Sequence, residues 1–373
     1  MKQNHNKIKI VITGGGSGGH VEPALAVAKV LQNHPDVNLS WIGMIDGYAN
    51  IVARDNNIDF YPIDTGKIRR YVSVDNISDI LKTIGGVLQS LRILKRIKPD
   101  VVFSKSGFVS APVVFSAKLL GIPVVIHESD IVLGLTNRLL LRMAKKLCCG
   151  FPVRYYPSWV RKIAIYTGNP IQRHNVSSEV SAKIFQKYNL KENTLLILGG
   201  SQGSAAINQL IWDELNGYVN FFNVVHQVGA NNIDQAIREK NKLNLGERLL
   251  YHPVAYLSQT ELAVIMGKSK LAVSRTGAGT ITDLSFFKLP AILIPLPTSA
   301  NDHARANARY VEKCGGAQYY EQSDLTGVKL FNTVKNIAED KNKLHKMSID
   351  IATVNPIKAA ESVAEIILNE VKI

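Results

Sequence analysis

The sequence predicts an α/β protein of two units that face a cleft, each built on a parallel, doubly wound sheet. Short apolar runs alternate with helical patterns from end to end. The alternation pauses at residues 168–170 and restarts, and a glycine-rich turn follows the first strand of each half. This βαβ rhythm is typical of sheets whose ligands bind at the carboxyl ends of the strands. A length of 373 residues is sufficient for two separate cores.

The first half contains short apolar runs that we expect to be buried strands, at residues 8–12, 39–43, 100–103 and 123–126. Apolar residues at helical spacing predict a helix over 23–31 and a longer one over 77–97. A strand-like run at 163–165 then ends in turn residues. The order strand, helix, strand therefore extends through this half.

The second half repeats the pattern. Strands are expected at residues 194–198, 223–225, 271–273 and 291–294. The spacing of Val363, Ile366, Ile367 and Val371 then predicts a closing amphipathic helix over 357–371.

The composition is that of an ordinary globular protein, with 46% hydrophobic and 20% charged residues, and it excludes long disordered segments. No run of about 18 apolar residues occurs, and the first strand begins without a signal-peptide core, so we expect the protein to stay in the cytosol. The three cysteines lack metal-ligand spacing, which predicts buried thiols rather than zinc or a disulfide.

Positive charge is concentrated in the first half. Residues 1–165 hold 22 of the 44 basic and 11 of the 30 acidic side chains, so they carry +11 of the total +14. Such an asymmetry suggests an anionic partner: nucleic acid, a phosphorylated substrate or an acidic membrane surface. Aromatic residues are not interleaved with the basic ones, so nucleic acid is not the expected partner.

The loop after the first predicted strand contains Gly14, Gly16 and Gly19, the G-x-G-x-x-G spacing of dinucleotide-binding proteins. Two features argue against a nicotinamide cofactor. The acid expected after the second strand is missing, because Trp41-Ile42-Gly43-Met44 stands there. The loop also ends in His20, which places an imidazole in the first turn of the following helix.

The position of His20 suits catalysis at an anionic site. Glycines allow close approach of the backbone to a ligand, and free N–H groups at a helix start favour phosphate. The same positive helix end disfavours a protonated imidazole, so His20 should be neutral near pH 7 and able to accept a proton. A capping or purely structural histidine is the alternative.

Two more glycine-rich loops, at residues 199–204 and 274–280, follow strands and open helices in the second half. Two helix N-termini at one cleft could hold the diphosphate of a nucleotide sugar without metal. Asp283, one turn into the second helix, could then bind ribose hydroxyls. The absence of an Asp-x-Asp sequence also argues against a metal-dependent site, and structural glycine turns are the alternative.

Taken in order, the motifs resemble those of the MurG family of N-acetylglucosaminyltransferases, over nearly the whole chain. They are Gly15-Gly16-Ser17-Gly18-Gly19-His20-Val21, Ser106-Gly107-Phe108-Val109-Ser110, His127-Glu128-Ser129-Asp130, Gly134-Leu135-Thr136-Asn137, Gly168-Asn169-Pro170, residues 199–203, residues 274–283 and Asn307-Ala308. The run at residues 65–71 and the His-Glu-Ser-Asp motif look like the branch found in low-GC Gram-positive bacteria.

The resemblance implies a GT-B fold, in which two Rossmann-like domains face a cleft and a C-terminal helix packs back on the first. Residues 1–165 are then expected to bind the acceptor and the membrane, residues 166–355 to bind the UDP-sugar, and residues 356–373 to form the returning helix. The implied reaction is inverting, metal-independent transfer of N-acetylglucosamine from UDP-N-acetylglucosamine to the C4 hydroxyl of the muramyl sugar of lipid I. It gives lipid II for peptidoglycan synthesis and needs no cofactor.

The same resemblance assigns the site residues, with His20 as the candidate catalytic base and no metal ligand. Acceptor contacts are expected from Gly15, Gly16, Ser106, Gly107, Phe108, His127 and Glu128. Donor contacts are expected from Ser17, Gly18, Gly19, Asp130, Gln172, Arg173, Ser201, Gln202, Leu257, Ala278, Gly279, Thr280, Ile281, Thr282, Asp283 and Ala304.

Some of these positions depart from the residues usual in the family. Asp283 stands where Glu is common, Asp130 where Asn is common, Gln172 where Arg is usual and Ala304 where a Gln is expected. All four belong to the expected donor set, so the differences concern donor contacts rather than the family pattern as a whole.

The long helix predicted near residue 77 suggests a surface for anionic lipid at the cytoplasmic membrane face. Its apolar positions are Ile77, Ile80, Leu81, Ile84, Val87, Leu88, Leu91 and Leu94, flanked by Lys67, Arg69, Arg70, Lys82, Arg92, Lys95, Arg96 and Lys98. A core helix with a solvated basic rim is an equally open interpretation.

Three functional hypotheses remain: the lipid I transferase, a related GT-B enzyme that glycosylates another lipid such as diacylglycerol, and a non-catalytic nucleotide-sugar-binding protein or even a dehydrogenase. The Gly-Gly-His loop and the motif at His127 favour the first of these over the second.

Overall fold

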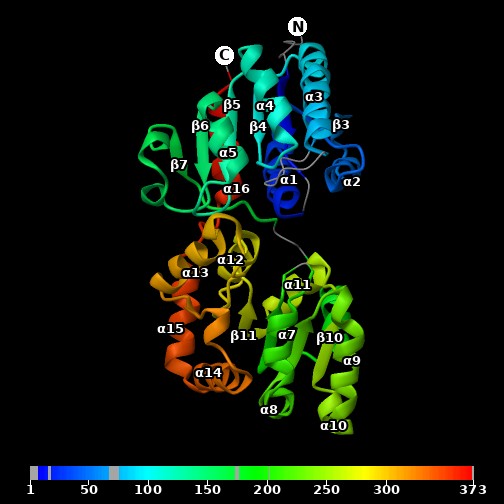
Figure 1. Ribbon diagram of the computed structural model, residues 1–373, viewed down its shortest axis with the longest axis vertical. Coiled ribbons are helices and arrows are strands. Elements are labelled where there is room, and N and C mark those ends of the chain that lie inside the picture. Colours follow the sequence, from blue (N-terminus) through cyan, green and yellow to red (C-terminus); the bar gives the residue numbers. More distant parts are fainter. Residues whose placement is uncertain (1–6, 16–17, 67–74, 173–175, 201, 372–373) are drawn as a thin grey trace. The chain divides into compact units, whose positions relative to one another are not determined.

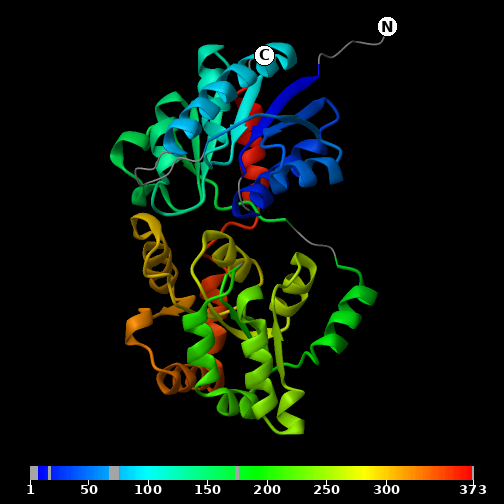
Figure 2. The same ribbon diagram turned by 45° about the vertical axis from the view of Figure 1, so that its right-hand side comes forward.

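The computed structural model describes residues 7–15, 18–66, 75–172, 176–200 and 202–371, with the backbone alone for residues 75–81. The chain forms two compact units, Met1–Gln172 with Pro356–Ile373 and Arg173–Asn355 (Figure 1). Each unit has its own parallel sheet with helices on both faces (Figures 1 and 2). The predicted α/β class with two Rossmann-like domains is confirmed.

The sheet of the first unit has the strand order β3-β2-β1-β4-β5-β6-β7. These strands are β1 (Ile8–Thr13), β2 (Val37–Gly43), β3 (Asp59–Pro62), β4 (Val101–Ser104), β5 (Val124–Glu128), β6 (Lys146–Cys149) and β7 (Ala164–Tyr166). The helices are α1 (Gly18–Gln32), α2 (Tyr48–Asp55), α3 (Asp75–Ile97), α4 (Ser110–Leu119), α5 (Leu135–Leu140) and α16 (Ala359–Asn369).

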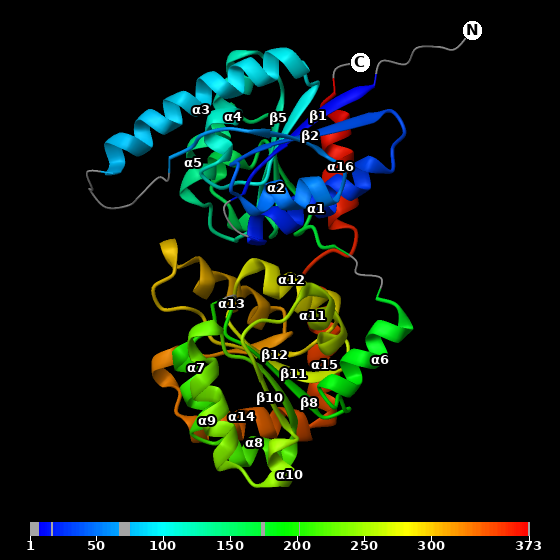
Figure 3. The same cartoon turned by 90° about the vertical axis from the view of Figure 1, so that its right-hand side faces the viewer.

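Figure 3 shows α1, α2 and α16 on one face of this sheet and α3, α4 and α5 on the other. Val363, Ala364 and Ile367 of α16 are buried in one cluster with apolar residues of α1, β1 and β4. Full burial of one Val or Ile side chain contributes about 1.5–3 kcal/mol. The predicted return of the closing helix to the first domain is confirmed.

The sheet of the second unit has the order β10-β9-β8-β11-β12-β13. Its strands are β8 (Thr194–Leu198), β9 (Asn223–Gln227), β10 (Tyr251–Val254), β11 (Ser269–Ser274), β12 (Ala291–Leu293) and β13 (Ala317–Tyr319). Its helices are α6 (Ser178–Lys187), α7 (Ala205–Trp212), α8 (Leu215–Phe221), α9 (Ile233–Lys242), α10 (Leu245–Arg248), α11 (Gln259–Met266), α12 (Ala278–Phe286), α13 (His303–Lys313), α14 (Gly327–Glu339) and α15 (Lys341–Ile351).

The strand orders determine where loops meet. In each sheet the chain starts near the middle, moves to one side and then crosses back to the other. The first strand therefore lies beside one that comes much later: β1 beside β4, and β8 beside β11. The loops after these paired strands diverge to opposite faces, which creates the crevice where α/β sheets bind ligands.

A buried polar network crosses the core of the second unit. His226 Nε2–H donates to Asn208 Oδ1 at 3.0 Å, and Tyr251 O–H donates to His226 Nδ1 at 3.1 Å. Trp212 Nε1–H donates in turn to the Tyr251 oxygen at 2.9 Å. Both ring nitrogens of His226 are used, so the network requires a neutral imidazole. Burial accordingly lowers the pKa of His226 to about 3.

This histidine should make the second unit sensitive to acid. The unfolded chain binds a proton near the ordinary histidine pKa of about 6.5, whereas the folded chain resists protonation until about pH 3. Stability should therefore fall as the pH drops through that window. We expect His226→Gln to lower stability at neutral pH but to weaken its pH dependence, as measured by urea unfolding. His345→Gln, at an exposed position on α15, is the control and should leave the dependence unchanged.

Candidate active site

The two glycine loops of the first unit are in contact at the ends of β1 and β4. Gly14 and Gly107 have φ angles of +143° and +91°. A Cβ on Gly107 would lie 2.6 Å from the Gly15 carbonyl oxygen, closer than side chains pack. Only glycine therefore allows this approach at residue 107. The structure brings together Gly15, Ser106 and Gly107, three of the residues predicted to contact the acceptor.

His20 is the third residue of α1, which begins at Gly18 rather than at the expected Pro23. The apolar spacing starts later than the helix because glycines occupy its first two positions. Burial, followed by the nearby Lys105 ammonium, lowers the pKa of His20 to about 4. The buried Nδ1 of His20 has no hydrogen-bond partner among the described residues. His20 is therefore neutral near pH 7 and carries an unused lone pair.

Glu128 connects the loop after β5 to the start of α5. Its carboxylate accepts from the backbone N–H groups of Asp130 at 3.1 Å and Gly134 at 2.9 Å, and from Asn137 Nδ2 at 3.0 Å. Burial, followed by the negative charge of Asp130, raises the Glu128 pKa. Asn137 also donates to Ser106 Oγ. Glu128 thus joins the loop after β5 to the start of α5, and Asn137 links both to Ser106 in the loop after β4.

His127 is fully buried at the end of β5. Its Nε2–H donates to the Gly168 carbonyl at 3.0 Å, and its own carbonyl accepts from Ser106 Oγ at 2.8 Å. Burial, followed by the charge of Lys105, holds its pKa well below the usual value. In this structure His127 and Glu128 position the loops. Gly107 and Phe108 are partly exposed, whereas Gly15, also predicted to contact the acceptor, is buried.

In the second unit, α12 follows β11, which lies beside β8 at the point where the order of the strands reverses. Gly277 is the N-cap and provides no side-chain hydrogen bond, which leaves the first N–H groups of the helix available to an anion. Gly279, Thr280 and Asp283 lie toward the accessible side of this turn, whereas Ile281 and Thr282 are buried. Of the predicted donor residues 278–283, three are therefore at least partly exposed to solvent, and the side chains of the other three are buried in the core.

Gln227, at the end of β9, links two predicted donor segments. Its Nε2 donates to the Gly200 carbonyl at 2.9 Å, and its Oε1 accepts from the Leu257 N–H at 3.0 Å. The neighbouring Gln202 is exposed. The glycine loop after β8 and the segment at Leu257 therefore form one connected surface.

Two predicted donor residues have other partners. Ala304 is buried on α13, and its carbonyl accepts from Thr276 Oγ1 at 2.7 Å. Gln172 belongs to the first unit, where its Oε1 accepts from Lys29 Nζ at 3.1 Å and its Nε2 donates to Glu22 Oε2 at 3.4 Å. Gly18, Gly19 and Asp130 are at least partly exposed in the first unit. The predicted residues Gly16, Ser17, Arg173 and Ser201 lie outside the described residues.

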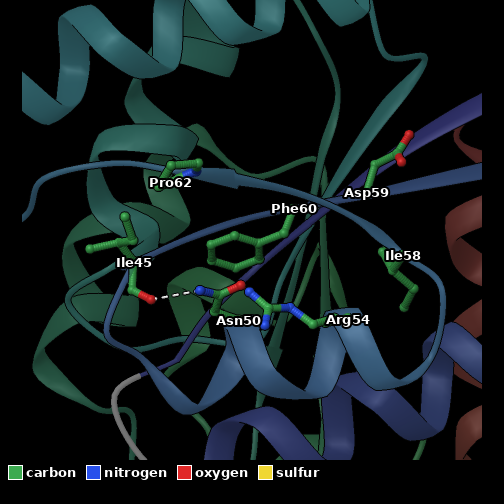
Figure 4. A pocket seen from close by; sticks show the side chains of 7 residues that line it. All are labelled: Ile45, Asn50, Arg54, Ile58, Asp59, Phe60 and Pro62. Atoms are coloured by element: carbon green, nitrogen blue, oxygen red, sulfur yellow. Dashed lines mark hydrogen bonds between the residues drawn. The ribbon is translucent and has the colours of Figure 1, made fainter.

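A pocket of about 410 Å³ lies away from these loops, between α2 and the edge strand β3 (Figure 4). Figure 4 shows the Phe60 ring beside Asn50, whose Nδ2 donates to the Ile45 carbonyl at 2.7 Å. None of the predicted site residues lines it; its lining residues are Ile45, Asn50, Arg54, Ile58, Asp59, Phe60 and Pro62.

Sequence reasoning assigned no role to three residues that organise the two sites: Lys105, Gln227, and Asn137, which it named only as part of a motif. Each is a polar residue buried beside a predicted glycine-rich loop. A lysine directly after an apolar strand run was the one available signal, because residues 101–104 are otherwise purely strand-like. The hydrogen bonds of Asn137 and Gln227 join segments distant in sequence, so no local pattern indicates them.

Comparison with known proteins agrees with this organisation. Residues 10–149 match the glycosyltransferase family 28 N-terminal domain, and residues 194–364 match the C-terminal domain of the same family. A UDP-N-acetylglucosamine--N-acetylmuramyl-(pentapeptide) pyrophosphoryl-undecaprenol N-acetylglucosamine transferase of Clostridium botulinum is 37% identical over 337 residues, 90% of this chain and 92% of the relative. The protein of the same name from Clostridium kluyveri is 35% identical, over 95% of this chain and 99% of the relative.

Among solved structures, the crystal structure of Acinetobacter baumannii MurG matches with a TM-score of 0.74 at 28% identity, over 97% of this chain and 99% of that one. The two domain matches, the near-complete coverage of the relatives and the order of the glycine-rich motifs along the chain all indicate the same family. This chain belongs to glycosyltransferase family 28, and within that family to the MurG transferases.

Proposed function

We propose that this chain transfers N-acetylglucosamine from UDP-N-acetylglucosamine to the C4 hydroxyl of the muramyl sugar of lipid I, with inversion at the anomeric carbon, to give lipid II. The observation that carries the proposal is the meeting of two glycine loops around a neutral His20 at the start of α1. This arrangement provides N–H groups for the acceptor diphosphate and a base for the hydroxyl.

The second unit would hold the donor. The uncapped N-terminus of α12 can stabilise the diphosphate of UDP and the charge that develops as UDP departs. Asp283, on the same accessible side as Gly279 and Thr280, would accept hydrogen bonds from the ribose hydroxyls. The helix end would supply the stabilisation of the leaving group, so the proposal requires no metal or other cofactor.

The test is transfer of radiolabelled N-acetylglucosamine by the full chain. Label is expected on a lipid I analogue and not on diacylglycerol. Thermal unfolding with UDP-N-acetylglucosamine, UDP-glucose and NADH compares the donors, and the first should raise the melting temperature most. Transfer to diacylglycerol in preference to lipid I, or stabilisation by NADH alone, would overturn the proposal.

We further propose that the outer face of α3, α4 and α5 contacts the anionic cytoplasmic face of the cell membrane. Within the described ranges, no helix combines the length and apolar character needed to cross a bilayer. Large apolar side chains are nevertheless exposed on all three helices, from 40% at Leu135 to 60% at Leu119; the others are Ile84, Leu88, Phe115 and Leu139. Exposed basic residues around them are Lys82, Arg92, Lys95, Lys118, Arg138 and Arg142.

The pattern of burial along α3 supports this proposal. Gly86 and Leu94 carry the buried stripe of α3, and a Cβ on Gly86 would collide with the backbone of Asp64. Ile84 and Leu88 are turned away from that stripe. The side chains of Ile77, Ile80 and Leu81 and the basic run at residues 67–70 lie outside the described part. An apolar patch with basic neighbours is the composition that favours interfacial binding.

Leu119→Glu should weaken binding to vesicles of phosphatidylglycerol. The substitution removes burial worth about 1.5–3 kcal/mol and adds repulsion from the lipid charge, so binding should fall at least tenfold in co-sedimentation. Leu245→Glu is the matched control, because Leu245 is 79% exposed in the second unit. Equal binding of the two variants would contradict the assignment of this face.

A further inference from the structure

Helix α2 connects the glycine loop after β1 to the pocket between α2 and β3. At the start of this helix, Ala49 Cβ lies 3.7 Å from where a Cβ on Gly15 would stand. The next residue along the chain, Asn50, lines the pocket, and so does Arg54 in the last turn. Five helical residues cover about 7.5 Å, so Arg54 lies roughly that far along the axis from Ala49. The pocket therefore begins beside the loop proposed to hold the acceptor and leads away from it.

The lining of this pocket is mostly apolar. Phe60 and Pro62 of β3 form part of it, together with Ile45, which follows β2 and has 59% of its surface exposed. The volume of about 410 Å³ falls within the range of about 300–1,000 Å³ that is usual for ligand sites. Because the lining is partly exposed, a chain segment can enter from the side of the glycine loop.

Arg54 brings a positive charge to this lining. Within the described part of the chain, no hydrogen bond or ion pair engages its guanidinium. Figure 4 shows the side chain directed toward Asn50 and the Phe60 ring, whereas the carboxylate of Asp59 points away from it. A guanidinium recognises a carboxylate through two parallel N–H···O bonds. The pocket therefore suits a chain segment that ends in a carboxylate.

A peptide attached to the acceptor is long enough to reach the pocket. The Clostridium botulinum relative is named for an acceptor that carries a pentapeptide on its muramyl sugar. Five extended residues span at most about 17 Å. In the sheet, β2 separates β1 from β3, so the ends of these two strands are about 10 Å apart. A peptide that starts at the glycine loop after β1 can therefore place its carboxyl end beside β3.

We infer that the pocket between α2 and β3 binds the peptide of the acceptor, with the terminal carboxylate of the peptide on Arg54. The inference rests on the proposed function, which places the muramyl sugar at the glycine loops. The peptide takes no part in the chemical step, so the ground state and the transition state should share this contact equally. A contact of that kind lowers KM and leaves kcat unchanged.

The test compares two soluble lipid I analogues with short lipid chains, one ending in the peptide carboxylate and the other in the corresponding amide. For the full-length wild type, the KM of the carboxylate should be about tenfold lower, the factor expected of one charge-assisted pair. The two kcat values should be equal. Arg54→Met should raise the KM of the carboxylate to that of the amide. Arg238→Met, at an exposed position on α9 in the second unit, is the matched control and should keep the wild-type difference.

A second variant tests the apolar part of the lining. Ile45→Glu places a negative charge at the pocket, so it should raise the KM of the carboxylate more than that of the amide. Ile45 and Arg54 are both exposed, so neither substitution removes a buried side chain. Equal effects of Ile45→Glu on the two analogues would contradict a carboxylate bound in this pocket.

The remaining outcomes separate this inference from the proposed function. Equal KM values for the two analogues in the wild type, or a difference that persists in Arg54→Met, would overturn the inference while transfer itself continues. Loss of the difference in Arg238→Met would also overturn it, because the effect would then follow from the net charge of the protein. Absence of transfer to either analogue would instead refute the proposed function.

Discussion

His20→Ala should lower the rate of N-acetylglucosamine transfer about 10²- to 10⁴-fold, the range over which a positioned general base contributes. The variant removes the neutral imidazole at the start of α1 but leaves both glycine loops in the chain. Loss in kcat should therefore exceed any change in the affinity for UDP-N-acetylglucosamine. Turnover of radiolabelled donor and calorimetric binding of UDP measure the two effects separately.

The control for this variant is His345→Ala, at an exposed position on α15. It should turn over as the wild type does. An unchanged kcat in His20→Ala would show that another group accepts the proton. A large loss of donor affinity with unchanged kcat would instead place His20 in the binding of the nucleotide sugar.

Gly203→Ala should destabilise the second unit by about 2–5 kcal/mol, the sum of a left-handed backbone penalty and the cost of overpacking. Gly203 has a φ of +77°, and a Cβ there would lie 1.9 Å from the Val228 carbonyl oxygen. Gly229 packs against Gly203 and has a φ of +88°. Neither backbone segment can therefore move to make room for a Cβ without displacing the other. Affinity for UDP should fall as well, because this loop leads into α7.

Gly200→Ala is the matched control in the same loop. Gly200 also has a positive φ, +89°, but a Cβ there would have no neighbour within 4 Å. The free energy of unfolding of Gly200→Ala should therefore fall only by the backbone penalty of about 1–2 kcal/mol. Urea unfolding of the two variants separates strain from collision, and equal losses of stability would rule out the collision as the cause.

The long, regular elements follow from local pattern. Every apolar run assigned to a buried strand became one. Helix α16 lies within its predicted range, and α3 begins at Asp75, just before the predicted 77–97, and ends at Ile97. The strands that escaped prediction are β3, β6, β10 and β13, which have three or four residues each. Such short segments show no period, and their conformation depends on pairing with a neighbouring strand.

The apolar residues of α3 mark the limit of that reasoning. The pattern predicts a broad apolar face but does not indicate what covers it. The structure buries Leu94 and leaves Ile84 and Leu88 exposed. That division depends on where α4 and the segment at Asp64 pack, as the close approach at Gly86 shows. Long-range packing therefore decided between the core helix and the exposed patch.

The sequence by itself determined the two α/β units, the glycine loops and the histidine at the start of α1, because turn residues and apolar periods act within a few positions. Tertiary structure decided which loops meet. Strand order places β1 beside β4, and so brings Gly107 against Gly15 and Lys105 against Gly14. The electrostatics of His20 follow from that arrangement, since burial and the charge of Lys105 come from residues far apart in the chain.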